Sequence, residues 1–162
     1  MKYNEMMATG RSTKQKGFTL FELMITIALI AIITGVYLIA ANPAGQLASS
    51  RNTKRKSDIQ TILLAVRQNV ADQSNEQFSC SAGPIPTSTT RMKNASGGYN
   101  IAPCLVPTYI FNLPFDPSAT GTHYTSNMDY DTGYSIAINA STGQITVSAP
   151  YAELGKTVSI TQ

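Results

Sequence analysis

The sequence contains little charge and few of the side chains on which catalysis depends. Charged residues make up only 13% of its 162 residues, so its surface must rely on Ser, Thr, Asn and Gln for solubility. Such a composition is unusual for a cytosolic domain and ordinary for an exported one. The only histidine, His123, lies in a stretch rich in Gly and Thr, and no Ser or Cys occurs in a recognisable nucleophile context. We therefore expect a protein that is not an enzyme and has no cofactor.

The net charge of +3 is confined to the N-terminus. Of the 12 basic and 9 acidic residues, four bases and one acid lie within residues 1–17, which leaves eight of each sign in the rest of the chain. A protein that binds nucleic acid through an overall positive charge carries that charge on its folded part. The neutral remainder therefore does not support nucleic-acid binding as the function.

A long apolar run follows this basic segment. Residues 18–41 are apolar apart from Glu22 and three Thr, and as a helix they span about 36 Å, enough to cross a bilayer. The apolar core of an ordinary secretory signal has only about 7–15 residues and ends at its cleavage site. A plain membrane anchor explains the length but not Glu22, because an ionisable group within a span costs about 2.5–3.5 kcal/mol. Glu22 therefore indicates a selected role.

The stretch 16–23, KGFTLFEL, resembles the class III signal of type IV pilins and of type II secretion pseudopilins. The resemblance implies that residues 1–17 form a leader, which a prepilin peptidase in the membrane removes by cutting after Gly17 on the cytoplasmic side. Phe18 then becomes the N-terminus and is N-methylated, and Glu22 stands fifth in the mature chain. The resemblance also implies that the leader faces the cytoplasm and that the C-terminal domain lies outside.

This motif predicts a pairing of charges between copies. The cut leaves a cation at the Phe18 amine, and a cation in an apolar environment needs a partner. We expect Glu22 of a neighbouring subunit to be that partner, and the pair to set the axial register. Thr19 is also expected to act in assembly. The alternative is a Glu22 that snorkels or is protonated and has no partner. Gly17 is expected to let the peptidase approach the backbone closely, and its alternative role is that of a helix boundary.

A helix break is expected near the end of the apolar run. Pro43 lacks an amide hydrogen and clashes with the preceding turn, so the helix must kink or stop there, and Gly35 weakens it earlier. In the family that the motif resembles, part of this helix unwinds when a subunit enters a filament. The corresponding stretch here is 35–43, and a static kink is the alternative.

Residues 42–75 are expected to form a second, amphipathic helix. Lys54 and Asp58 are four residues apart and can pair on its exposed side. Its apolar residues fall at three- and four-residue spacings and form one stripe: Leu47, Ile59, Ile62, Leu63, Val66 and Val70.

This helix also carries a basic cluster, formed by Arg51, Lys54, Arg55 and Lys56. No aromatic side chains are interleaved with these four charges, which disfavours binding of DNA or of anionic lipid. The cluster is expected to be a solvated helix face, or to pair with acids such as Asp72 and Glu76 of neighbouring copies.

Residues 76–162 are expected to form a globular domain outside the cytoplasm. Gly and Pro predict loops over 76–122, with one helical turn at 108–113. Alternating apolar and polar residues predict strands at 134–140 and 144–149, joined by a short turn, and at 156–161. The sheet is expected to cover the helix stripe with Tyr134, Ile136, Ile138, Ile145 and Val147, which gives an α+β, pilin-like fold.

A disulfide and a candidate calcium site are considered within this domain. Cys80 and Cys104 do not have metal-site spacing, and in an exported domain they are expected to form a disulfide, with two buried free thiols as the alternative. Asn127, Asp129 and Asp131 offer oxygens at alternate positions, as calcium loops do, but without the distal Glu of an EF-hand. Calcium is thus the one metal that the sequence raises, and a turn with Asp at strand ends is the alternative.

The expected function is that of a structural subunit, made as a prepilin, that polymerises into a type IV pilus-like filament. The implied partners are other copies, the prepilin peptidase and N-methyltransferase, the inner-membrane assembly platform and minor pilins, with nucleic acid involved only indirectly through DNA uptake. The chain would cross the cytoplasmic membrane once before it enters a filament. A secretion or competence pseudopilin is the nearest alternative. A membrane-anchored binding domain that never polymerises is an alternative of a different class.

Overall fold

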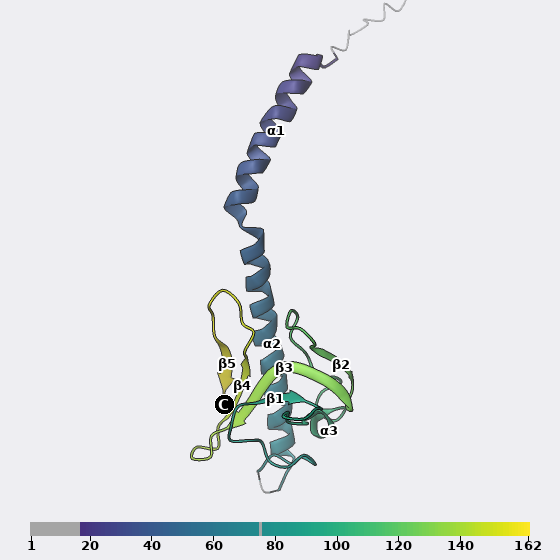
Figure 1. Cartoon of the computed structure of the whole chain (residues 1–162), viewed down its shortest axis with the longest axis vertical. Helices are drawn as coiled ribbons and strands as arrows, with labels where there is room; N and C mark the ends of the chain where they lie inside the picture. Colours follow the sequence, from purple (N-terminus) through teal and green to yellow (C-terminus); the bar gives the residue numbers. More distant parts are fainter. Residues whose placement is uncertain (1–16, 75) are drawn as a thin grey trace, which may run out of the picture. The chain divides into compact units, whose positions relative to one another are not determined.

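The computed structural model describes residues 17–74 and 76–162, so residues 1–16 of the expected leader lie outside the described part. The chain divides into two compact units between Asn42 and Pro43. The first unit contains α1 (Leu20–Ala41). The second contains α2 (Pro43–Ala71), the short helix α3 (Ala102–Leu105) and a five-stranded antiparallel sheet, as labelled in Figure 1.

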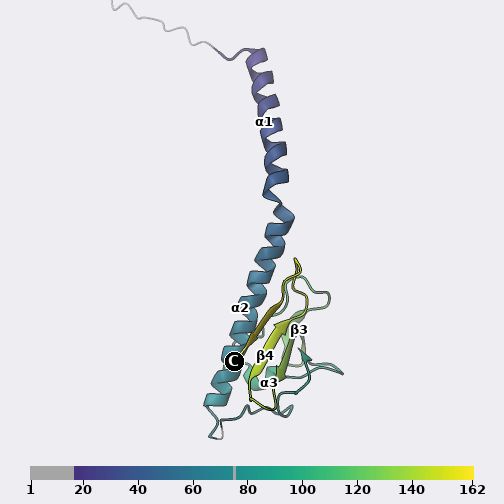
Figure 2. The same ribbon diagram turned by 90° about the vertical axis from the view of Figure 1, so that its left-hand side faces the viewer.

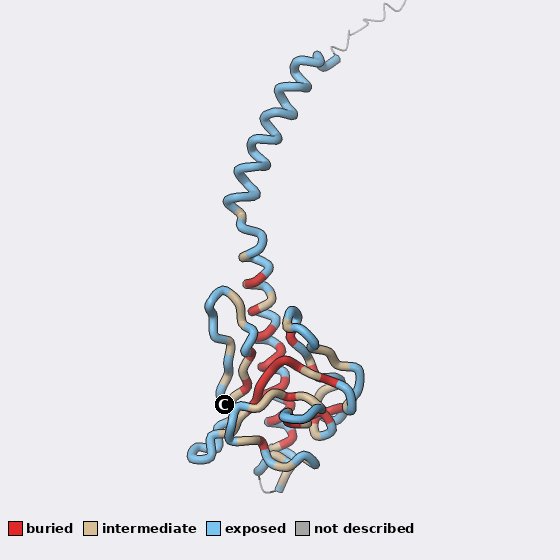
Figure 3. Tube along the Cα trace, viewed as in Figure 1, coloured by how far each residue is buried: buried red, intermediate tan, exposed pale blue. Residues whose placement is uncertain are grey.

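The first unit is an apolar helix with no buried residue. The exposed fractions of its large apolar side chains run from 44% at Ile25 to 85% at Ile39, and α1 is pale blue almost throughout in Figure 3. The helix continues through Gly35 and ends at Asn42, whose φ of 40° and ψ of 64° are left-handed. Gly35 is therefore not a break in this structure, because a single glycine weakens a helix without ending it.

The second helix begins on Pro43, the residue predicted to stop or kink the first. A proline fits the first position of a helix, because its missing amide hydrogen has no partner there in any case. The helix ends at Ala71, earlier than the expected residue 75. The amide of Gln73 bonds to the carbonyl of Val70 at 3.1 Å, three residues back, so the last turn tightens and the helix does not continue.

The sheet is centred on β3 (Asp129–Ile138), which pairs with β1 (Thr90–Lys93), β2 (His123–Ser126) and β4 (Ile145–Ala149), while β4 pairs with β5 (Val158–Thr161). The three strands predicted from alternation are confirmed as β3, β4 and β5. Val147 lies opposite both Ile136 and Ile160, so apolar side chains gather on one face. Figure 2 shows this sheet lying along one side of α2.

Three elements of the second unit are unexpected: β1 and α3 lie in the stretch 76–122 predicted to form loops, and β2 follows it directly. The strands β1 (TRMK) and β2 (HYTS) have four residues each and do not alternate apolar with polar side chains. The helical turn predicted at 108–113 is wrong, and the short helix α3 lies earlier in the chain. It ends because Val106 takes an extended backbone, as a residue before proline does.

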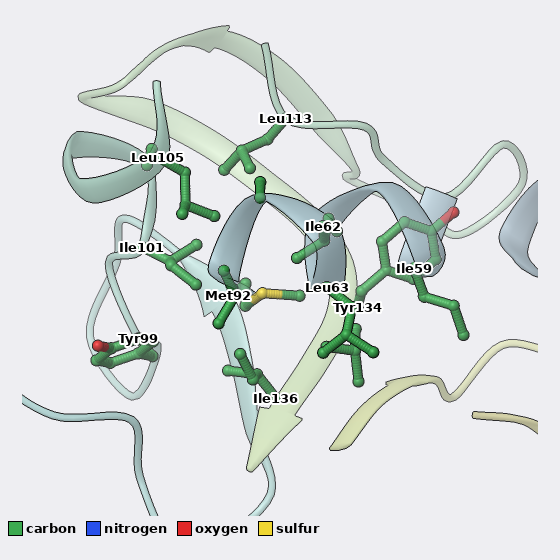
Figure 4. Packing of buried hydrophobic residues seen from close by; sticks show 14 of the residues in the cluster. Ile59, Ile62, Leu63, Met92, Tyr99, Ile101, Leu105, Leu113, Tyr134 and Ile136 are labelled. Atoms are coloured by element: carbon green, nitrogen blue, oxygen red, sulfur yellow. The ribbon is translucent and has the colours of Figure 1, made fainter. Parts of the chain in front are cut away.

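The core forms where the helix stripe meets the sheet (Figure 4). Leu47 is 61% exposed and Val70 is half-buried, so the buried stripe is shorter than predicted. Ile138 and Ile145 are also only partly buried. The largest apolar side chains that are fully buried are Ile59, Ile62, Leu63, Val66, Met92, Ile101, Leu105, Leu113, Tyr134, Ile136 and Val147.

Candidate processing and assembly sites

The segment expected to be cut is exposed and irregular. Gly17, Phe18 and Thr19 precede the helix, and all three are exposed. A Cβ atom added at Gly17 would meet no atom within 4 Å. A protease can therefore reach the bond between Gly17 and Phe18, because exposed segments outside regular structure are the ones that proteases cut. Cleavage at this bond stays a prediction.

Glu22 lies in the first turn of α1, three residues after the helix cap Thr19. Thr19 has extended backbone, and its Oγ1 accepts a hydrogen bond from the Glu22 amide at 3.1 Å. A Thr cap followed by Glu at the third helical position is the capping-box pattern, and a carboxylate there also faces the positive end of the helix dipole. Both residues thus have a local role besides the one expected between copies. No basic side chain of the described residues forms an ion pair with Glu22.

A second constellation, which the sequence did not predict, surrounds Arg55 on α2. Its guanidinium group uses all five of its N–H donors. Nε and Nη2 donate to the two carboxylate oxygens of Asp116 at 2.7 and 3.1 Å, and both side chains are fully buried. Nη2 also donates to Ser118 Oγ at 2.7 Å. Nη1 donates to Asn52 Oδ1 and to Glu153 Oε2, both at 2.8 Å.

This network holds the loop between β4 and β5 against α2. The Asn52 side-chain amide donates to the Glu153 carbonyl at 2.8 Å, and its oxygen accepts from the Glu153 amide at 2.9 Å. Arg51 donates twice to the Glu153 carboxylate, at 2.8 and 2.6 Å. The loop is therefore fixed through its backbone as well as through its charge.

The arginines lower the pKa of both carboxyl groups in the network. Burial opposes ionisation of Asp116, but hydrogen bonds from Arg55 and from the backbone amides of Ser118 and Ala119 outweigh it, so its pKa lies below the ordinary value. Hydrogen bonds from Arg51 and then Arg55 lower the pKa of Glu153 to about 2. All the ionisable members are therefore charged at neutral pH.

Acid is expected to weaken this network. Because the pKa of Glu153 is lower in the folded chain, its charged form stabilises the fold above the ordinary value of 4.5, and that contribution is lost as the pH falls towards about 2. We predict that the thermal midpoint of the mature protein in detergent drops between about pH 5 and pH 2, and that Glu153→Gln makes the drop shallower. An equally steep drop in the variant would contradict this assignment.

The network corrects the expectation that the basic cluster of α2 is a solvated face. Arg55 is buried, and Arg51 is bound to the same glutamate that Arg55 contacts. Lys54 pairs with Asp58 at 2.9 Å, as their spacing predicts, but Asp58 is buried and not on the exposed side. Lys56 is exposed. The sequence held no signal for the burial of Arg55, because its acidic partners lie 61 and 98 residues further along the chain.

Cys80 and Cys104 are joined by a disulfide with an S–S distance of 1.95 Å. The expected pairing is therefore present, and the alternative of two free thiols does not apply. The bond ties the segment after α2 to α3. Asn69 on α2 supports the same junction, because its side-chain amide donates to the carbonyls of Ser79 and Cys104, both at 3.1 Å.

The three side chains expected for calcium have other partners in the structure. Asp131 accepts from Arg91 at 2.6 Å, Asp129 pairs with His123 at 3.0 Å, and Asn127 accepts from a tyrosine hydroxyl at 2.6 Å. Within residues 17–74 and 76–162, no group of three or more His, Cys, Asp or Glu side chains is placed to hold a metal ion. Calcium binding stays a prediction that requires these contacts to open.

Comparison with known proteins bears on the N-terminal segment. Residues 12–38 match the family model of the prokaryotic N-terminal methylation motif, and this stretch includes Gly17, Phe18 and Glu22. No curated protein and no solved structure matches the chain. The pilin-like α+β architecture of the remainder therefore rests on its helix and antiparallel sheet alone. The matched motif is the class III signal peptide of type IV pilins, and it supports a type IV pilin-like or pseudopilin precursor.

Proposed function

We propose that this precursor is the structural subunit of a type IV pilus-like filament, cut after Gly17 and assembled through α1. The observation that carries the proposal is the uncovered apolar surface of α1, most of which lies within the matched motif. Exposed apolar patches of this extent mark membrane or protein contacts. The 22 residues of α1 span about 33 Å, close to the thickness of the hydrocarbon core of a bilayer. Lipid would cover α1 before assembly, and the α1 helices of other copies would cover it afterwards.

Cleavage after Gly17 changes the charge of the subunit in two ways that favour assembly. It removes residues 1–17, which carry the whole net charge of +3, and leaves a neutral chain suited to dense packing. It also creates the Phe18 amine, which has no partner within an apolar filament core unless Glu22 of another copy provides one. Processing and polymerisation are thus two steps of one mechanism.

This proposal fixes the expected partners and location. The subunit would cross the cytoplasmic membrane once, with its leader inside and the unit of Pro43–Gln162 outside. The prepilin peptidase, the assembly platform and minor pilins would act on it in turn. Its role would be structural rather than enzymatic.

Substitution of Gly17 by leucine is expected to block processing and to lower the cleaved fraction about tenfold or more, because a side chain there obstructs the approach of the peptidase. A Cβ at Gly17 meets no atom of the chain, so a defect would reflect the peptidase and not the fold. Gly35 is equally open and serves as the matched control, since Gly35→Leu should be cut normally. Precursor and mature bands on a gel give the readout, and normal cutting of Gly17→Leu would count against the assigned bond.

Electron microscopy of sheared surface material tests the proposal against its alternatives. A pilus subunit gives long filaments. A secretion or competence pseudopilin is cut in the same way but gives only short fibres within the envelope. A membrane-anchored binding domain that never polymerises is not cut and gives no filaments, and that result would overturn the proposal.

A further inference from the structure

Two exposed lysines beside the middle of α2 line one hollow and have no acidic partner among the described residues. Lys56 comes from α2 and Lys156 from the loop between β4 and β5. The hollow has a volume of about 420 Å³, and its other lining residues are Ser49, Asn52, Thr53 and Val158. In Figure 1 this loop, in yellow, lies beside the first half of α2.

The acids nearest to these lysines in the sequence are already bound elsewhere. Glu153, three residues before Lys156, is held by Arg51 and Arg55. Asp58, two residues after Lys56, accepts from Lys54 at 2.9 Å and from the Tyr134 hydroxyl at 2.8 Å. The hollow therefore keeps two positive charges that the surrounding described residues do not neutralise.

Two acidic residues lie just past the C-terminal end of α2, without a cationic partner in the described part of the chain. Asp72 and Glu76 are exposed, and no cation of the described residues forms an ion pair with either one. Among the described residues, Asp72 interacts with the neutral hydroxyl of Tyr109. A carboxylate near the C-terminal end of a helix is also disfavoured by the helix dipole. Both acids would therefore gain from a cation supplied by another molecule.

The spacing of the two charged sites along α2 fits a contact between parallel copies. Asp72 continues the helical hydrogen bonding of α2 through its amide bond to Gln68. At about 1.5 Å and 100° per residue, Asp72 lies about 24 Å along the helix from Lys56 and points about 160° away from it. Groups that meet across two parallel copies related by a shift must point in nearly opposite directions, as these two do.

We propose that the hollow lined by Lys56 and Lys156 binds the carboxylates of Asp72 and Glu76 from a second copy of this chain. The contact joins the middle of one α2 to the C-terminal end of another, so it is heterologous and repeats without closing, as a filament requires. It rests on the proposed function and adds to it a charged contact between the globular units. That contact is separate from the one between α1 helices.

Charge reversal in full-length chains tests this contact. The variant K56E/K156E carries acids on both sides of the proposed contact, and the variant D72K/E76K carries bases on both sides. Each alone is expected to lower the yield of sheared filaments about tenfold or more, because like charges then face each other. Expressed together, the two variants should restore filaments, since every contact between unlike copies again pairs acid with base. The matched control is Arg67→Glu, an exposed reversal on α2 that does not line the hollow and should assemble normally.

The outcomes separate this inference from the function on which it rests. Full assembly of either variant alone, or no recovery on co-expression, overturns the contact. Loss of binding to anionic phospholipid vesicles by K56E/K156E, with filament yield unchanged, also overturns it and makes a lipid headgroup the occupant. A disulfide formed between Lys156→Cys of one copy and Glu76→Cys of another supports the contact independently. If the wild-type chain formed no filaments while that cross-link still appeared, the proposed function would fail and the contact would stand.

Discussion

The substitution Glu22→Ala is expected to leave cleavage after Gly17 intact and to reduce filament yield by about a hundredfold or more. The physical reason is the unpaired Phe18 amine, because a buried charge that loses its partner costs about 3–5 kcal/mol. Within α1 the backbone amide of Glu22, not its side chain, makes the capping bond to Thr19, so the substitution keeps that bond. The measurements are the ratio of precursor to mature bands and the quantity of filament sheared from the cell surface.

A second variant separates this charge effect from helix capping. Thr19→Ala removes the cap hydrogen bond and keeps the carboxylate, and loss of a cap costs only about 1 kcal/mol. It should therefore impair assembly much less than Glu22→Ala. Normal filaments from Glu22→Ala, or equal defects in the two variants, would show that Glu22 serves the helix start and not the contact between copies.

The second large effect is expected in the globular unit. Arg55→Ala should lower the free energy of unfolding by about 3–5 kcal/mol, because it leaves the buried carboxylate of Asp116 without its cation. Denaturant unfolding of the mature chain in detergent, followed by circular dichroism, measures this change. Arg51→Ala is the matched control, since its side chain is 34% exposed and such a pair contributes only about 0–1 kcal/mol.

The double variant Arg55→Met with Asp116→Leu tests whether the loss of stability comes from the unpaired carboxylate of Asp116. Removing both charges leaves neither one buried alone, so this variant should be more stable than Arg55→Ala. A loss for Arg55→Ala no larger than that for Arg51→Ala would mean that the network does not hold the β4–β5 loop to α2.

The sequence predicted those parts of the fold whose signals are local. The motif around Gly17 and Glu22 lies within a few residues, and the alternation that predicted β3 to β5 is a property of neighbouring positions. Pro43 indicates a break because its ring clashes with the preceding turn. The same residue proved to start α2, which is equally a local effect.

What the sequence could not show depends on distant partners. Arg55 belongs to a basic cluster that resembles a solvated face, and only the fold brings Asp116 and Glu153 to it. The strand β1 is stabilised by its pairing with β3, forty residues further on, and not by its own residue pattern.

Leu47 stays exposed although the next residue, Ala48, is buried. At about 100° per residue Leu47 points about 120° away from Ile59, so it lies off the buried face. The buried face at that level is instead carried by Ala48 and Asn52.

The most direct test of the central claim is mass spectrometry of the N-terminal peptide of subunits taken from sheared filaments. The account predicts long filaments whose subunits begin at Phe18, with a methyl group on the Phe18 amine. Filament subunits that retain residues 1–17, or that begin at another residue, would contradict it.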